Sequence, residues 1–202
     1  MSDFVNNKSF WDKIYNNEKA GWDMKSSTPV FKSYLKEQIF PVSSKILILG
    51  SGYGYDAIEA ARMGLNVTAV DFSPTAIRTA KKNADEQNVT VKFLVRDFFT
   101  LTKEFQNYFD LAYDYVTYCA IDPVRRKEYA KMIFDVLNCN GLFIALWFPV
   151  EKRAGGPPFG IDLNETQNIF IRHFELQLTA DHQDTIKPRK GREVLQVYKK
   201  RC

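Results

Sequence analysis

The stretch that decides the fold is Ile46-Leu47-Ile48-Leu49-Gly50-Ser51-Gly52-Tyr53-Gly54, which leads into the helical pattern 55–62. A short apolar run of this kind is typical of a strand buried on both faces of a parallel sheet. The glycines that follow allow a sharp turn and a close approach of the backbone to a ligand, because they carry no Cβ. The order of strand, glycine turn and helix therefore predicts an α/β fold with ligand contacts at Gly50 and Gly52.

An acidic residue follows the glycine turn at the spacing that a ribose requires. Asp71, followed by Phe72, lies about twenty residues after Gly50 at the end of the next strand, where a carboxylate can accept hydrogen bonds from ribose hydroxyls. A dinucleotide fingerprint would need Gly or Ala at position 55, which is Tyr55. The third glycine comes one residue early, which is typical of methyltransferases. The turn thus favours S-adenosylmethionine as cofactor, with S-adenosylhomocysteine as product, over a nicotinamide cofactor.

A second acid strengthens this interpretation. Asp97, followed by Phe98, comes directly after the third predicted strand, where such enzymes hold the adenine amino group. A loop cap is the alternative role for Asp97, and we weigh the two roles equally for this residue taken alone.

Strand patterns alternate with helical patterns from residue 45 onward, as expected for a parallel sheet covered by helices. The predicted strands are 45–49, 66–70, 90–95, 109–115, 141–148, 174–180 and 193–199. Helices are predicted at 30–40, 75–86 and 124–137, each after an N-cap residue and a proline: Thr28-Pro29, Ser73-Pro74 and Asp122-Pro123. Asn140-Gly141 indicates a turn before the fifth strand.

The last two strands are separated by about a dozen turn-forming residues, so they are expected to pair as an antiparallel hairpin. We therefore predict a single Rossmann-like class I methyltransferase domain over residues 1–202. Its core, residues 45–202, holds a seven-stranded, mostly parallel sheet with an antiparallel last strand. Residues 1–44 are predicted to form an N-terminal helical lid.

Composition excludes several other classes of protein. The 202 residues are 45% hydrophobic with a net charge of +4, and the longest apolar run, Leu142–Val150, is far shorter than a membrane span. The charged N-terminus does not match a signal peptide, so we predict a cytoplasmic protein with no membrane partner. The basic C-terminus lacks interleaved aromatic residues, which argues against nucleic acid. A monomer is expected, with a weak homodimer left open.

The cysteines and histidines have neither the number nor the spacing of a metal site. Cys119, Cys139 and Cys202 form no CxxC motif, and His173 and His182 are distant from the glycine turn. We predict no metal and no disulfide framework, and Cys119 is interpreted as a small buried residue.

Four further segments resemble the thiopurine methyltransferase superfamily, and within it the thiol and halide methyltransferases. They are Trp22-Asp23 with Thr28-Pro29, Phe109–Tyr115 with Cys119-Ala120-Ile121, Gly155-Gly156-Pro157-Pro158-Phe159, and Arg189-x-Gly191-x-Glu193. The resemblance implies cofactor contacts from Trp11, Tyr15 and Trp22 in the lid, besides Gly50, Asp71, Asp97, Phe98, Asp114 and Tyr115. The sequence departs from the group's pattern at Lys25, Tyr15 and Ser51, where the group often has Gly, Trp and Cys.

The chemistry that this resemblance implies is direct displacement, which requires alignment and exclusion of water but no covalent intermediate. We expect the acceptor to be a small soft nucleophile: a thiol, hydrosulfide or halide. The alternatives are a thiopurine-type or oxyanion-directed methyltransferase, or a protein that binds the cofactor without turnover. Candidates for the substrate pocket are Tyr118, Trp147, Arg153 and Phe159.

Overall fold

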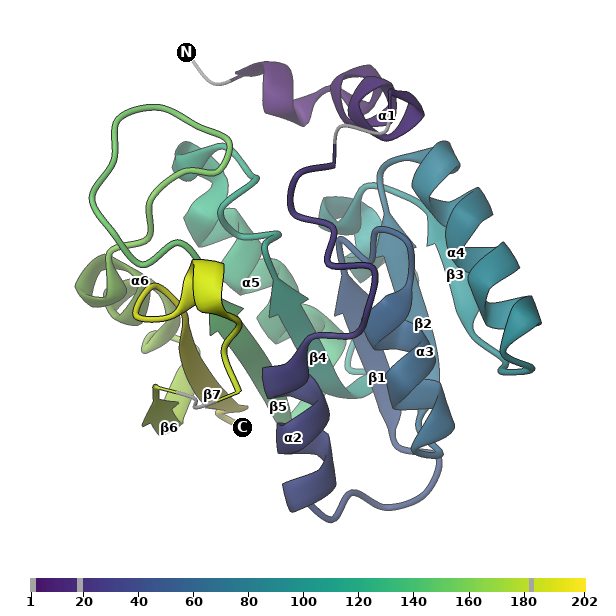
Figure 1. The fold of residues 1–202 in the computed structure, drawn as a ribbon. Coiled ribbons are helices and arrows are strands. Elements are labelled where there is room, and N and C mark those ends of the chain that lie inside the picture. The colour runs from purple at the N-terminus through teal and green to yellow at the C-terminus, as the bar shows by residue number, and fades with distance from the viewer. Residues whose placement is uncertain (1–2, 18–19, 182–183) are drawn as a thin grey trace.

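The computed structural model describes residues 3–17, 20–181 and 184–202, and its centre is a seven-stranded sheet with helices on both faces (Figure 1). The strands are β1 (Lys45–Leu49), β2 (Asn66–Asp71), β3 (Lys92–Val95), β4 (Phe109–Tyr115), β5 (Leu137–Trp147), β6 (Phe174–Ala180) and β7 (Val194–Lys200). The α-helices are α1 (Lys8–Asn16), α2 (Pro29–Glu37), α3 (Tyr55–Arg62), α4 (Pro74–Glu86), α5 (Arg126–Val136) and α6 (Leu163–Phe170). The short 3₁₀ helices are η1 (Asp3–Asn6), η2 (Phe98–Lys103), η3 (Pro123–Arg125) and η4 (Lys187–Arg189).

The strand order is β3-β2-β1-β4-β5-β7-β6. Neighbouring strands from β3 to β5 run parallel, and β7 pairs antiparallel with both β5 and β6. The predicted Rossmann-like class and the antiparallel final hairpin are therefore confirmed. The order reverses between β1 and β4, and this switch point is where open α/β sheets bind their ligands.

Alternate residues of β1 face the two sides of the sheet. Ile46 and Ile48 belong to a core with α2, α3 and α4, whereas Leu47 and Leu49 belong to a core with α5 and α6. All four side chains are buried, as predicted for a strand covered on both faces.

Helix α2 belongs to this core rather than to a lid, although it lies within the predicted lid 1–44. Phe31 is fully buried and stacks on Tyr113 of β4, with ring centroids 3.8 Å apart. Thr28 occupies the predicted N-cap position before Pro29, but its side chain makes no capping hydrogen bond. Its hydroxyl and N–H donate instead to the Asp56 carboxylate at the start of α3, at 2.8 and 2.6 Å. In Figure 1, α1 lies beyond the carboxyl ends of the strands, as does the long loop between β5 and α6.

The structure also differs from the prediction at β5 and at α6. Asn140-Gly141 does not end an element, because β5 begins at Leu137 and its register against β4 shifts between Phe109 and Leu111. The irregularity accommodates Asn140 at φ +62°, a left-handed conformation that asparagine tolerates. Helix α6 was not predicted from the sequence. The Asp162 side chain caps it by accepting hydrogen bonds from the N–H groups of residues 164 and 165.

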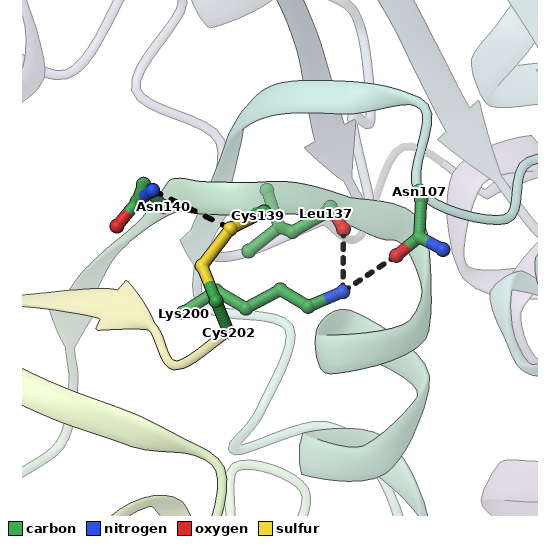
Figure 2. Close-up of a disulfide and its surroundings, with 6 residues drawn as sticks. All are labelled: Asn107, Leu137, Cys139, Asn140, Lys200 and Cys202. Atoms are coloured by element: carbon green, nitrogen blue, oxygen red, sulfur yellow. Dashed lines mark hydrogen bonds between the residues drawn. A yellow bond between two sulfur atoms is a disulfide. The ribbon is translucent and has the colours of Figure 1, made fainter.

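The prediction of no disulfide is contradicted by a bond between Cys139 and Cys202 (Figure 2). The Cα atoms lie 5.3 Å apart, and the bond joins the exposed start of β5 to the C-terminus across 63 residues of sequence. Lys200 supports the same junction, because its ammonium group donates to the Leu137 carbonyl and to the Asn107 side chain, both at 2.7 Å. The odd number of cysteines obscured the pairing, since Cys119 remains free and buried.

We predict that Cys202→Ser lowers the free energy of unfolding by roughly 2–4 kcal/mol without reductant, because the bond restricts the unfolded chain. Chemical denaturation measures the change. With a dithiol reductant, wild type and variant are expected to have the same stability. If the variant were still less stable than wild type under reductant, the lost stability would come from the cysteine side chain and not from the disulfide bond.

Candidate cofactor and substrate site

A cavity of about 610 Å³ lies beyond the carboxyl ends of the central strands. Gly50, Asp71 and Thr117 line it from the ends of β1, β2 and β4, and Trp11 and Trp22 line it from the N-terminal segment. This volume is within the range of small-molecule sites, and its position at the switch point is the one expected for an α/β sheet.

The glycine turn closes the base of this cavity. Gly50 and Gly52 have φ angles of +54° and +53°, which residues with a Cβ rarely adopt. A Cβ on Gly50 would lie 2.2 Å from the Thr117 hydroxyl oxygen, and that hydroxyl donates to the Leu49 carbonyl at 3.0 Å. A side chain at position 50 would therefore displace both the turn and the end of β4.

Asp71 joins the turn to the end of β2. Its carboxylate accepts hydrogen bonds from the N–H groups of Gly52 and Ser73, both at 2.8 Å. A carboxylate has about four lone-pair positions, so acceptor capacity remains on the side that lines the cavity. Burial raises the pKa of Asp71 to about 6, against the opposing effect of these main-chain donors.

Asp97 caps a helix and also lines the cavity. It caps η2 by accepting a hydrogen bond from the Phe99 N–H at 3.0 Å, and it lines the cavity together with Phe98 and Phe99. The Arg125 guanidinium stacks on the outer aromatic ring, 3.5 Å from the Phe99 centroid. An acid among aromatic faces suits a flat, cationic or amino-bearing ligand.

Aromatic residues of the N-terminal segment cover the opposite side of the cavity. The Trp22 ring makes edge contacts with Trp11 and Tyr15 at centroid distances of 5.9 and 5.7 Å. Asp12 anchors this cover to the start of α4, since it accepts hydrogen bonds from the Ser73 hydroxyl at 2.5 Å and the Thr75 N–H at 3.1 Å. The ionised form of Asp12 is favoured at this helix N-terminus, and the Ser73 bond lowers its pKa.

The charges in the lining are separated by element. Asp71 ends β2 and Asp97 follows β3, whereas Arg189 and Arg192 precede β7. The carboxylates paired with these arginines, on Glu193 and Glu151, are outside the cavity lining. The end of the cavity near β2 and β3, which we call the acidic end, thus holds both carboxylates and the Arg125 guanidinium, and the end near β7 holds two guanidinium groups.

The sequence pattern of the thiopurine S-methyltransferase family matches residues 6–201. The chain belongs to this family. It is therefore an S-adenosylmethionine-dependent methyltransferase, as predicted. Family membership also agrees with the site, because the buried acid of Asp71 and the glycine cradle fit an adenosine group.

Individual relatives cover nearly the whole chain. A probable thiol methyltransferase 2 of Arabidopsis thaliana is 33% identical over 198 residues, 96% of this chain and 86% of that protein. Thiocyanate methyltransferase 1 of the same plant is 28% identical and covers 94% and 84%. A Burkholderia thailandensis 1,6-didemethyltoxoflavin-N1-methyltransferase, solved with S-adenosylhomocysteine bound, superimposes with a TM-score of 0.74 at 18% identity, covering 96% and 87%.

The structure places most of the residues predicted to contact the cofactor around one cavity. Trp11, Tyr15, Trp22, Gly50, Asp71, Phe72, Asp97 and Phe98 all line the cavity. Gly52 lies just outside the lining and contributes its N–H to Asp71. These positions follow from local motifs, which the sequence displays directly.

Asp114 and Tyr115, also predicted as cofactor contacts, are not among the residues that line the cavity. Asp114 is 1% exposed, and its carboxylate accepts hydrogen bonds from the N–H groups of Thr117 and Tyr118 and from the Tyr129 hydroxyl. It fixes the turn after β4 from inside the core, where burial raises its pKa to about 6. Tyr115 is hydrogen-bonded through its hydroxyl to Glu193.

The four predicted substrate-pocket residues are also placed elsewhere. Tyr118 and Trp147 are each 1% exposed, and the Trp147 indole donates to the Gln196 side chain at 2.7 Å. Both point into the core beneath α5 and α6, which the strand pattern could not distinguish from the cavity side. Arg153 pairs with Glu151 at 3.6 Å, and the Phe159 ring packs on Gly156 of its own loop.

Several residues of the lining were not predicted. They are Val5, Asn6, Phe10, Ile14, Gly21, Phe99, Val116, Thr117, Cys119, Ala120, Ile121, Arg125, Phe148, Pro157, Pro158, Pro188, Arg189 and Arg192. Six of them belong to segments that resemble the family, and only the folded loops show that they reach the cavity: Cys119, Ala120, Ile121, Pro157, Pro158 and Arg189.

No cluster of metal-ligating side chains occurs in the described part of the chain, and His182 lies outside that part. Within the same residues, no helix has the length and apolar character needed to cross a bilayer.

We predict that S-adenosylhomocysteine binds about tenfold more weakly at pH 5 than at pH 8, because only ionised Asp71 can accept from both ribose hydroxyls. A carboxyl group with a pKa of about 6 is mostly protonated at the lower pH. Calorimetry measures the dissociation constant.

Asp71→Asn is the matched control, since Asn cannot titrate. We expect its affinity to be weak and constant over the same range. Equal pH dependence in wild type and variant would assign the titration to another group.

Proposed function

We propose that this methyltransferase transfers the methyl group of S-adenosylmethionine to a small, soft and anionic nucleophile: a thiolate, hydrosulfide or halide. The observation that supports this proposal is the pair of arginines, Arg189 and Arg192, at the end of the cavity away from the acids. The names of the two plant relatives, a thiol and a thiocyanate methyltransferase, point in the same direction.

We assign cofactor binding to the acidic end of the cavity. Asp71 would accept hydrogen bonds from the ribose, and Asp97 would accept one from the adenine amino group. Trp11, Tyr15 and Trp22 would cover the ligand and exclude water. The bound cofactor supplies a methyl carbon made electrophilic by its sulfonium group.

The residues of the chain would contribute alignment and desolvation rather than a covalent nucleophile. Cys119 is unsuited to attack, because burial raises the pKa of its thiol far above the ordinary range. An anionic acceptor arrives already able to attack, so no general base is required. Arg192 would attract it, and the aromatic cover would remove its hydration shell.

A thiopurine-type acceptor is the second candidate. Phe148, Pro157 and Pro158 give the cavity flat apolar walls, which would suit an aromatic ring. We further expect a monomer that acts on small molecules, without a nucleic-acid or membrane partner. A cytoplasmic location remains our prediction, although disulfides are uncommon in that compartment.

A panel of iodide, hydrosulfide, thiocyanate, small thiols and thiopurines, incubated with labelled S-adenosylmethionine, tests the acceptor class. We expect methylated product from the small anions and thiols, at rates well above those with thiopurines. Turnover of thiopurines alone would favour the second candidate. Turnover of none would contradict the proposed class.

Arg192→Gln is expected to raise KM for the anionic acceptor about tenfold, because one charge-assisted contact is lost. The affinity for S-adenosylhomocysteine should change less than twofold. Glu151→Gln is the matched opposite, because Glu151 holds Arg192 with two bonds of 2.8 Å. Freeing the guanidinium should lower KM. Steady-state kinetics measures both, and an equal loss of cofactor affinity in either variant would contradict this role of Arg192.

A further inference from the structure

Arg189 connects the two ends of the chain at the cavity. Its side chain is 8% exposed and lines the cavity, and its Nη2 group donates to the main-chain carbonyl of Trp22 at 2.9 Å. The two residues are 167 positions apart in the sequence. One comes from the hairpin that ends the sheet, and the other from the aromatic cover of the cofactor end.

The guanidinium of Arg189 is held by three side chains. The rings of Tyr115 and Phe148 lie 5.0 and 4.9 Å from it, and the Glu193 carboxylate lies 3.8 Å from Nη1. The Tyr115 hydroxyl is hydrogen-bonded to that same carboxylate. We call Tyr115, Phe148, Arg189 and Glu193 the arginine cluster. A buried ion pair of this kind adds little to stability but fixes geometry, because the guanidinium has few alternative positions.

The Trp22 segment, residues 20–27, depends on this cluster for its position. Its other described contacts include the hydrogen bond from the Asp23 N–H to the Ala20 carbonyl at 2.9 Å and the packing of the Trp22 ring on Trp11 and Tyr15 of α1. The Asp12 contacts secure α1, and the Thr28 contacts to Asp56 secure the start of α2. Between these two anchors, two of the described polar contacts join the segment to the sheet: the Arg189 bond and a weak contact of the Tyr115 hydroxyl with the Met24 sulfur at 4.0 Å. Both polar contacts come from the arginine cluster, and Met24 also packs against the core that contains α2 and α3.

We infer that Arg189 is a positioning residue for methyl transfer, which holds the Trp22 segment against the bound cofactor. It acts through the Trp22 segment and does not contact the reacting methyl group. The inference rests on the proposed placement of the cofactor beneath Trp11, Tyr15 and Trp22. It does not depend on which acceptor is used.

Lysine cannot replace arginine in this role. The planar guanidinium can donate to the Trp22 carbonyl, face Glu193 and lie between two aromatic rings at the same time. A single ammonium group at the end of a flexible chain can satisfy the carboxylate but not this whole arrangement. Arg189→Lys therefore keeps the charge while it removes the positioning of the segment.

A double-mutant cycle with Arg189→Lys and Trp22→Ala tests the inference. We expect each single variant to weaken S-adenosylhomocysteine binding about tenfold, measured by calorimetry. In the double variant, the loss of affinity is expected to stay near tenfold and not reach a hundredfold, because the effects of substitutions at coupled residues do not add. Stopped-flow measurement should show faster release of the ligand from Arg189→Lys. Lys190→Met, which removes an exposed charge next to Arg189 and outside the cavity lining, is the control and should bind like wild type.

Other outcomes separate this inference from the proposed function. A hundredfold loss in the double variant, or an Arg189→Lys protein with unchanged ligand affinity, would overturn the positioning role while leaving the cofactor site in place. Failure of the wild-type protein to bind S-adenosylhomocysteine would overturn the site itself. If Arg189→Lys fails to fold, as judged by circular dichroism, Tyr115→Phe and Glu193→Gln in the same cycle with Trp22→Ala replace it. Additive losses there would also overturn the inference.

Discussion

The hydrogen bond from the Gly52 N–H to the Asp71 carboxylate holds the glycine turn and the end of β2 in one rigid unit, and the cavity is built around that unit. The strands β1 and β2 are adjacent and parallel, so their carboxyl ends meet at the same edge of the sheet. The turn passes close to the ligand, so its residues can carry no side chain. Gly50 and Gly52 meet this requirement, and as glycines they tolerate the positive φ angles of the turn. Burying Asp71 costs free energy, as its raised pKa shows, and this cost is partly offset by main-chain donors.

Around this rigid base, the rest of the site is made of parts contributed by distant segments. Asp12 binds α1 to the N-terminus of α4, and Arg189 holds the Trp22 carbonyl from the final hairpin. The cover is thus attached to two different sides of the sheet. Asp71 and Asp97 are separated from Arg189 and Arg192, as the proposed reaction between a cationic methyl donor and an anionic acceptor requires.

The fold and the cofactor end of the site could be predicted from local patterns in the sequence. Strand, glycine turn and acid lie within a short span, and each residue's role follows from backbone geometry that the pattern encodes. Thr28 shows the limit of this reasoning, because the helix begins where the pattern predicts but the Thr28 side chain bonds to Asp56, 28 residues along the sequence. The prediction that Tyr118 and Trp147 line the substrate pocket is wrong for another reason. A position at the end of a strand does not determine which face of the sheet a side chain lies on. Arg189 and Arg192 needed the folded hairpin, and the Cys139–Cys202 bond needed the pairing of β5 with β7.

A crystal structure of the protein with S-adenosylhomocysteine tests the central claim most directly. We predict that both ribose hydroxyls lie within hydrogen-bonding distance of the Asp71 carboxylate, with the thioether sulfur directed toward the end of the cavity that contains Arg189 and Arg192. A ligand bound outside the cavity, or one whose ribose is distant from Asp71, would contradict the account.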